Sequence, residues 1–128
     1  MKISRVDAPR CLVGEGTVWD AKTQALYYLD IVGRKIHRYE PASGATRTWQ
    51  TPTSVGALAL RGRTDAVTGA VISQEDGFYG IDFDSGALNR IAAVKDKPDR
   101  ARFNDGKADR RQGRADRLFL PAELISGC

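Results

Sequence analysis

The stretch YEPASGA, residues 39–45, returns as IDFDSGA at residues 81–87, an offset of 42 residues. Each copy reads as an extended strand, an acidic residue, a Ser-Gly turn and a second strand. A period of about 40 to 50 residues with four strands per unit is typical of β-propeller blades. The repeat therefore predicts at least two blades, each a four-stranded antiparallel sheet.

The segments around this repeat are also short and apolar, and turn residues separate them. The expected strands are residues 17–19, 25–31, 35–39, 45–50, 55–60, 67–73, 78–83 and 88–94. No segment shows apolar residues at a helical spacing over ten or more positions. Trp19-Asp20 resembles a WD dipeptide, but no matching pair follows one period later. We therefore expect an all-β fold that is not of the WD type.

A third unit begins near Phe103 and carries polar side chains that match the first unit. Asn104 lies 89 residues after Glu15, about two periods, and Ala57 occupies the corresponding place between them. In a propeller the innermost strands of all blades line one central channel. Glu15 and Asn104 are therefore expected to face one polar pocket, which is the arrangement that a metal or substrate site needs.

The net charge of +4 is confined to one short stretch of this 128-residue chain. Residues 100–117 hold seven Arg or Lys and three Asp, and the remainder is neutral. Only one aromatic residue, Phe103, lies among these basic residues, which argues against a nucleic-acid partner. No apolar run approaches the roughly 20 residues that cross a bilayer, and no secretory signal is apparent. We expect a cytoplasmic chain without a membrane partner, whose two cysteines form no disulfide framework.

Six motifs together resemble the family of gluconolactonases, SMP-30 (regucalcin) and luciferin-regenerating enzyme. They are GEGTVWD (14–20), LYYLDI (26–31), KIHRY (35–39), VGALAL (55–60), EDGF (75–78) and RFNDGK (102–107). The resemblance implies a six-bladed propeller, of which this chain is the N-terminal part: about two blades and the start of a third. It also implies a divalent metal in the channel and hydrolysis of sugar lactones, with metal-activated water attacking the lactone carbonyl.

The resemblance also assigns roles to individual residues. Glu15 matches the first metal ligand of the family, and Arg102 and Asn104 match residues that contact the substrate. Calcium is the expected metal, with zinc, magnesium or manganese as alternatives. The other ligands and the catalytic base are expected in blades that this chain lacks, so the catalytic residues lie outside it. A carboxylic ester hydrolase of the lactonase type is implied, and the chain alone is expected to be inactive.

The resemblance fades near the C-terminus. Residues 1–113 are expected to form the propeller part, and residues 114–128 a divergent tail of the kind that a frameshift produces. Open blade edges also predict self-association. A non-catalytic β-repeat module that binds calcium or a protein partner is the alternative function. His37, the only histidine, is interpreted as a strand-face residue and not as a catalytic base.

Overall fold

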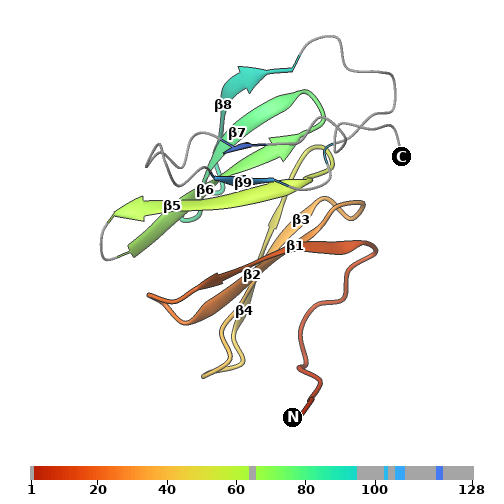
Figure 1. Ribbon diagram of the computed structural model, residues 1–128, viewed down its shortest axis with the longest axis vertical. Helices are drawn as coiled ribbons and strands as arrows, with labels where there is room; N and C mark the ends of the chain where they lie inside the picture. The colour runs from red at the N-terminus through yellow and green to blue at the C-terminus, as the bar shows by residue number, and fades with distance from the viewer. Residues whose placement is uncertain (1, 64–65, 95–102, 104–105, 109–117, 120–128) are drawn as a thin grey trace.

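Ten strands form three antiparallel sheets in the computed structural model, which describes residues 2–63, 66–94, 103, 106–108 and 118–119. The first sheet comprises β1 (Gly14–Asp20), β2 (Ala25–Asp30), β3 (Lys35–Tyr39) and β4 (Thr46–Gln50), in that order (Figure 1). The second comprises β5 (Ala57–Arg63), β6 (Ala66–Gln74), β7 (Gly77–Asp82) and β8 (Leu88–Ala93), again in order. A two-stranded sheet pairs β9 (Lys107–Ala108) with β10 (Leu118–Phe119). Within these described ranges no helix is long and apolar enough to span a membrane.

The all-β prediction is confirmed, and all eight predicted strands occur within a few residues of their expected bounds. The largest differences are of three residues: β5 ends at Arg63 and not at residue 60, and β1 begins at Gly14 and not at residue 17. A β-bulge between Glu15 and Val18 lets the strand continue through the two glycines, with Gly14 opposite Asp30. The start of this strand was not predicted because Gly14, Glu15 and Gly16 are residue types that are common in turns.

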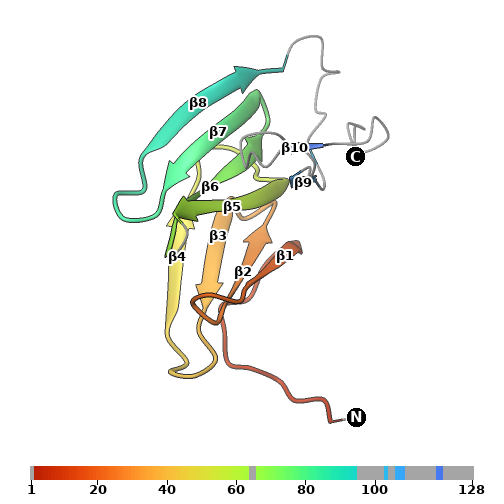
Figure 2. The same ribbon diagram turned by 60° about the vertical axis from the view of Figure 1, so that its left-hand side comes forward.

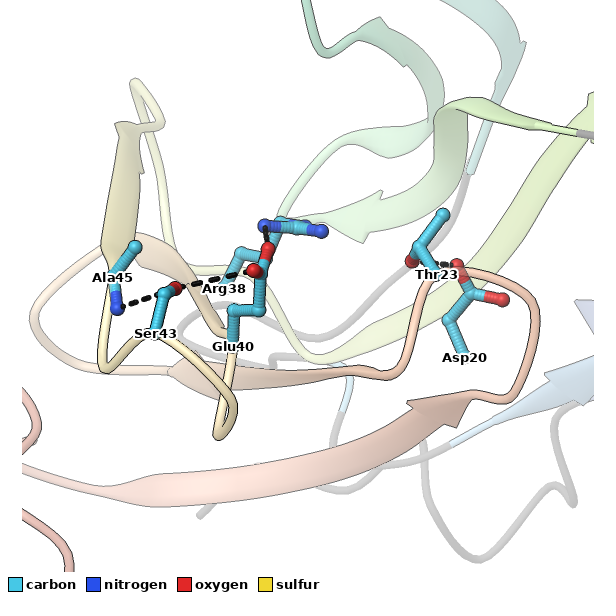
Figure 3. A network of polar contacts seen from close by, with 6 residues as sticks. All are labelled: Asp20, Thr23, Arg38, Glu40, Ser43 and Ala45. Atoms are coloured by element: carbon cyan, nitrogen blue, oxygen red, sulfur yellow. Dashed lines mark hydrogen bonds and ion pairs between the residues drawn. The ribbon is translucent and has the colours of Figure 1, made fainter.

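The turn after β3 shows how the repeated sequence closes a hairpin. The Glu40 N–H donates to the carbonyl of Ala45 at 3.0 Å, and the Gly44 N–H donates to the Glu40 carbonyl at 2.8 Å. The Ser43 hydroxyl donates to Glu40 Oε1 at 3.1 Å and accepts from the Ala45 N–H at 3.2 Å (Figure 3). Arg38 completes this network by an ion pair with Glu40 at 3.3 Å. Gly44 has φ of 73°, a conformation that favours glycine.

The turn after β7 repeats these contacts. The Asp82 N–H donates to the Ala87 carbonyl at 3.0 Å, the Gly86 N–H donates to the Asp82 carbonyl at 2.7 Å, and Gly86 has φ of 74°. The N–H groups of Ser85 and Asp84 also donate to the Asp82 carboxylate, which holds the pKa of Asp82 below its usual value. The sequence repeat is therefore also a repeat of backbone hydrogen bonds.

The two four-stranded sheets pack face to face around one apolar core. The first sheet contributes Tyr27, Leu29, Ile36 and Trp49, and the second contributes Leu58, Ala70, Ile72 and Ile81. Phe83, just after β7, lies between the rings of Tyr27 and Trp49, with centroids 5.2 and 4.5 Å away. Figure 2 shows the sheets as successive blades, which confirms the partial-propeller prediction.

Candidate functional site

The innermost strands of successive units lie side by side, so their polar residues are brought toward one region. β1 contacts β5, and β5 contacts β9 (Figures 1 and 2). Whether Glu15 and Asn104 face one pocket stays a prediction, because Asn104 lies outside the described residues. Ala57, at the start of β5, is buried and offers no ligand atom.

Glu15 is the candidate metal ligand in this region, and the β-bulge of β1 presents it. Gly16 has φ of +64°, and a Cβ added there would lie 2.8 Å from Leu29 Cδ1, so the bulge needs glycine. Glu15 is exposed, and no described residue forms a hydrogen bond or ion pair with its carboxylate. An unpaired carboxylate on an innermost strand is available to bind a cation.

The motif RFNDGK is described only in part. Phe103 is buried, and its ring lies against that of Phe78 at a tilt of 41°, with a centroid distance of 5.3 Å. Its backbone crosses Gly56 so closely that a Cβ at Gly56 would lie 2.1 Å from the Phe103 carbonyl oxygen. The motif is thus anchored at the start of β5, as the third unit requires. Arg102 and Asn104 lie outside the described residues, and their approach to Glu15 stays a prediction.

A groove of about 420 Å³ opens beside Glu15, between the first sheet and the N-terminal segment. Glu15 lines it from β1, and Leu26, Tyr28 and Tyr39 line it from β2 and β3. The opposite wall is residues 5–10. The groove is therefore bounded by the sheet face that does not pack against the second sheet.

Asp30 fastens the N-terminal segment to the first sheet. Its buried carboxylate accepts the N–H groups of Leu12 at 2.9 Å, Val13 at 3.1 Å and Gly33 at 2.9 Å. Burial alone would raise the pKa of Asp30, but these three N–H groups outweigh it and lower the pKa. This role of Asp30 was not predicted from the sequence. An Asp followed by a glycine three residues later is a turn signal that could have indicated it.

We expect Asp30→Ala to lower the free energy of unfolding by about 3 kcal/mol at pH 7, because three N–H groups lose a charged acceptor. The folded-state pKa is lowered, so this stabilisation is present above the unfolded pKa of about 4 and is lost as pH falls through the folded value. Urea unfolding at pH 7 and at lower pH measures both effects. Asp84→Ala, which removes an exposed carboxylate, should change little. Equal stability losses in the two variants would contradict the role of Asp30.

His37 is a buried residue of the strand face, in keeping with its interpretation from sequence. Its Nδ1 lies 2.8 Å from the Thr48 hydroxyl, and its ring lies on Tyr28 with centroids 4.9 Å apart. Burial lowers the pKa of His37, although the charge of Asp30 opposes the shift. The imidazole is therefore neutral near pH 7 and makes packing contacts.

The described residues do not complete a metal site. In that part of the chain no three His, Cys, Asp or Glu residues cluster to hold an ion. Glu15 supplies one oxygen donor, whereas calcium takes about six to eight oxygen ligands. The half-buried Cys11 adds no thiolate, because burial and then the charge of Asp30 raise its pKa. Glu15 could supply one hard ligand, and a complete metal site would need further ligands from outside the described residues.

Sequence comparison relates the chain to lactonases. The profile described as the SMP-30/Gluconolactonase/LRE-like region matches residues 13–115. The 6-deoxy-6-sulfogluconolactonase of Pseudomonas putida is 32% identical over 98 residues, covering 77% of this chain and 32% of the relative. Regucalcin of Gallus gallus is 35% identical over 109 residues, covering 85% of this chain and 35% of the relative.

A solved structure shows the same arrangement of strands. Regucalcin of Agrobacterium tumefaciens strain C58, described as a calcium-binding protein, superposes with a TM-score of 0.68 at 27% identity. The match covers 78% of this chain and 32% of that protein. The chain thus spans about a third of the length of the relatives it matches.

Proposed function

Because this chain belongs to the SMP-30/gluconolactonase/LRE-like family, we propose that it carries the first part of the metal and substrate site of a sugar-lactone hydrolase. The observation that supports this most strongly is Glu15. It is an exposed carboxylate with no hydrogen-bond or ion-pair partner among the described residues, and a glycine-dependent bulge presents it on an innermost strand. A carboxylate that served only the turn or the fold would be expected to bond to neighbouring N–H groups, as that of Asp30 does.

Glu15 is proposed to ligate a divalent cation. Calcium is the first candidate, because carboxylate oxygen is a hard donor and a structural relative is described as calcium-binding. Zinc, magnesium and manganese are the alternatives. When bound, such an ion polarises a lactone carbonyl or lowers the pKa of a bound water. The glycine-dependent bulge at Gly16 keeps Glu15 on β1, the strand that contacts β5.

Arg102 and Asn104 are proposed to position the sugar lactone. Phe103, the residue between them in the sequence, is buried and packs against Phe78 and Gly56. These contacts anchor the backbone at Phe103. A guanidinium and a carboxamide can hold sugar hydroxyls, and the guanidinium can stabilise negative charge that develops as the ring opens. The isolated chain is proposed to lack turnover, because its described residues supply a single ligand.

A chimaeric enzyme tests this function. Residues 13–115 of this chain replace the matched third of the Pseudomonas putida lactonase, and hydrolysis of a sugar lactone is followed as acid release. We expect hydrolysis that a chelator abolishes and a divalent metal restores. A chimaera that folds, as shown by circular dichroism, but hydrolyses no lactone would contradict the proposal.

In the same chimaera, Arg102→Ala is expected to raise the KM for the lactone about tenfold or more, because a charged hydrogen-bond donor to the substrate is lost. Steady-state kinetics over a range of lactone concentrations measures the change. Arg90→Ala removes an exposed arginine of β8 and serves as the control with an unchanged KM. An equal KM in the two variants would exclude Arg102 from substrate binding.

A further inference from the structure

Two arginines lie side by side on the face of the first sheet that packs against the second sheet. Arg38 of β3 is directly opposite Tyr27 of β2 on one side and Arg47 of β4 on the other, so the three side chains form one row. The row lies at the junction of the two four-stranded sheets, whose strands are all described. Like charges directly opposite each other in a sheet are destabilising. The pair of arginines therefore calls for a compensating charge.

Both guanidinium groups are held over aromatic rings. Cζ of Arg38 lies 6.0 Å from the ring centroid of Tyr27, and Cζ of Arg47 lies 4.7 Å from that of Trp49. Nη2 of Arg47 also donates to the carbonyl of Asp84 at 3.2 Å. These contacts order the two planar sets of N–H donors. Donors that are already ordered lower the entropic cost of binding an anion.

The charge of this pair is compensated only in part. Arg38 forms an ion pair with Glu40 at 3.3 Å through one terminal nitrogen (Figure 3), and Arg47 forms no ion pair with a described residue. Asp20, whose charge also reaches this row, already accepts the Thr23 hydroxyl and a turn N–H (Figure 3). One positive charge of the pair is thus left without a carboxylate partner among the described residues.

The Tyr27 hydroxyl adds a third donor beside the two arginines. Tyr27 is 3% exposed, and the charges of Arg38 and Arg47 both act on its hydroxyl. Burial raises the pKa of Tyr27, although Arg38 opposes the shift, so the hydroxyl keeps its proton near pH 7. A guanidinium donates hydrogen bonds and cannot accept them. Arg38 therefore cannot take the hydroxyl proton, which can be donated to an anion.

The second sheet shows that a blade of this chain does not need two arginines here. The position of Arg38 is held by Gly80, one repeat of 42 residues later. The position of Arg47 is held by Asn89. A single guanidinium, that of Arg61, lies over Gly80, 2.9 Å from where a Cβ would stand. The second arginine is thus specific to the first sheet, which favours a binding role over a purely structural one.

We propose that Tyr27, Arg38 and Arg47 bind a phosphate group at the junction of the two sheets. The planar guanidinium groups match phosphate oxygens, and the Tyr27 hydroxyl donates to a further oxygen. The bound anion offsets the repulsion between the two arginines. Its source is inorganic phosphate or the ester of a small molecule. This inference does not depend on the proposed lactone chemistry, in which these three residues take no part.

An NMR titration of the purified chain with inorganic phosphate at constant ionic strength tests the proposal. The indole N–H of Trp49 reports on the site, because Arg47 lies over its ring. We expect a saturable shift with a Kd of about 1 mM, the strength of a few charge-assisted hydrogen bonds. Arg47→Gln and Arg38→Gln should each weaken binding at least about tenfold, because each removes a charged donor.

Two controls and a second ligand make the result specific. Arg90→Gln removes an exposed arginine of β8 and should leave the affinity unchanged. If methyl phosphate binds more tightly than inorganic phosphate, the ligand is an ester, and otherwise it is free phosphate. Arg47 is exposed, so Arg47→Gln is expected to fold, which its NMR spectrum shows directly. A shift that sodium chloride reproduces, or equal affinity in Arg47→Gln and the wild type, would overturn the proposal.

Discussion

Replacement of Phe83 by alanine is expected to lower the free energy of unfolding by about 4 kcal/mol, more than is expected for Asp30→Ala. The Phe83 ring is buried between Tyr27 and Trp49 at the junction of the two sheets. The Trp49 indole N–H also donates to the Phe83 carbonyl at 3.0 Å, which holds the tryptophan in place. Loss of the ring leaves a cavity at this junction. Because small domains are stable by only about 5–15 kcal/mol, much of the total is lost.

Tryptophan fluorescence measures this effect at the junction itself. Trp49 is buried and Trp19 is exposed, so a Trp19→Phe background isolates the signal of Trp49. Urea unfolding in that background should show a lower midpoint for Phe83→Ala and a smaller loss for Phe83→Leu. Ile91→Ala, at an exposed position of β8, is the control for side-chain truncation. A loss below about 1 kcal/mol for Phe83→Ala would contradict this account of the sheet junction.

Replacement of Glu15 by glutamine in the chimaeric lactonase is expected to lower kcat/KM about 100-fold or more, because a bound metal contributes several kcal/mol to catalysis. Glutamine keeps the size of the side chain and removes only its charge. Since no described residue bonds to the Glu15 carboxylate, the substitution should leave the stability of the fold unchanged. A large loss of activity without a loss of stability is the expected signature of a ligand.

Glu75→Gln provides the matched control for this prediction. Glu75 is an exposed glutamate in the turn between β6 and β7, with a weak contact to the Ser54 hydroxyl at 3.3 Å. Its substitution should leave kcat/KM unchanged. If Glu15→Gln and Glu75→Gln retain equal activity, Glu15 is not part of the site.

Most of the fold could be predicted from the sequence, because the relevant signals are local. Glycine at residues 44 and 86 marks tight turns, and the apolar segments between such turns are strands. The start of β1 could not be predicted in this way. Gly14 and Gly16 look like turn residues, and only the pairing of β1 with β2 shows that they continue a strand through a bulge.

Only part of the candidate site could be predicted, because a sequence shows few signs of which distant residues are in contact. The repeat predicted that Glu15 faces a pocket shared with Asn104. The structure has Glu15 in β1, which contacts β5, and the shared pocket stays a prediction. The sequence could not show which face of the first sheet packs against the second sheet, because Leu26 and Tyr28 alternate with Tyr27 and Leu29 and both sets are apolar. Only the observed packing shows which set faces the second sheet.

Calcium binding by the chimaeric lactonase, with Glu15 or with Glu15→Gln, tests the central claim most directly. Equilibrium dialysis with radioactive calcium measures binding without depending on any particular lactone. The account predicts saturable binding when Glu15 is present and an affinity at least about tenfold weaker in Glu15→Gln, because the first carboxylate ligand is lost. Equal affinity in the two proteins would contradict the assignment of Glu15 as a metal ligand.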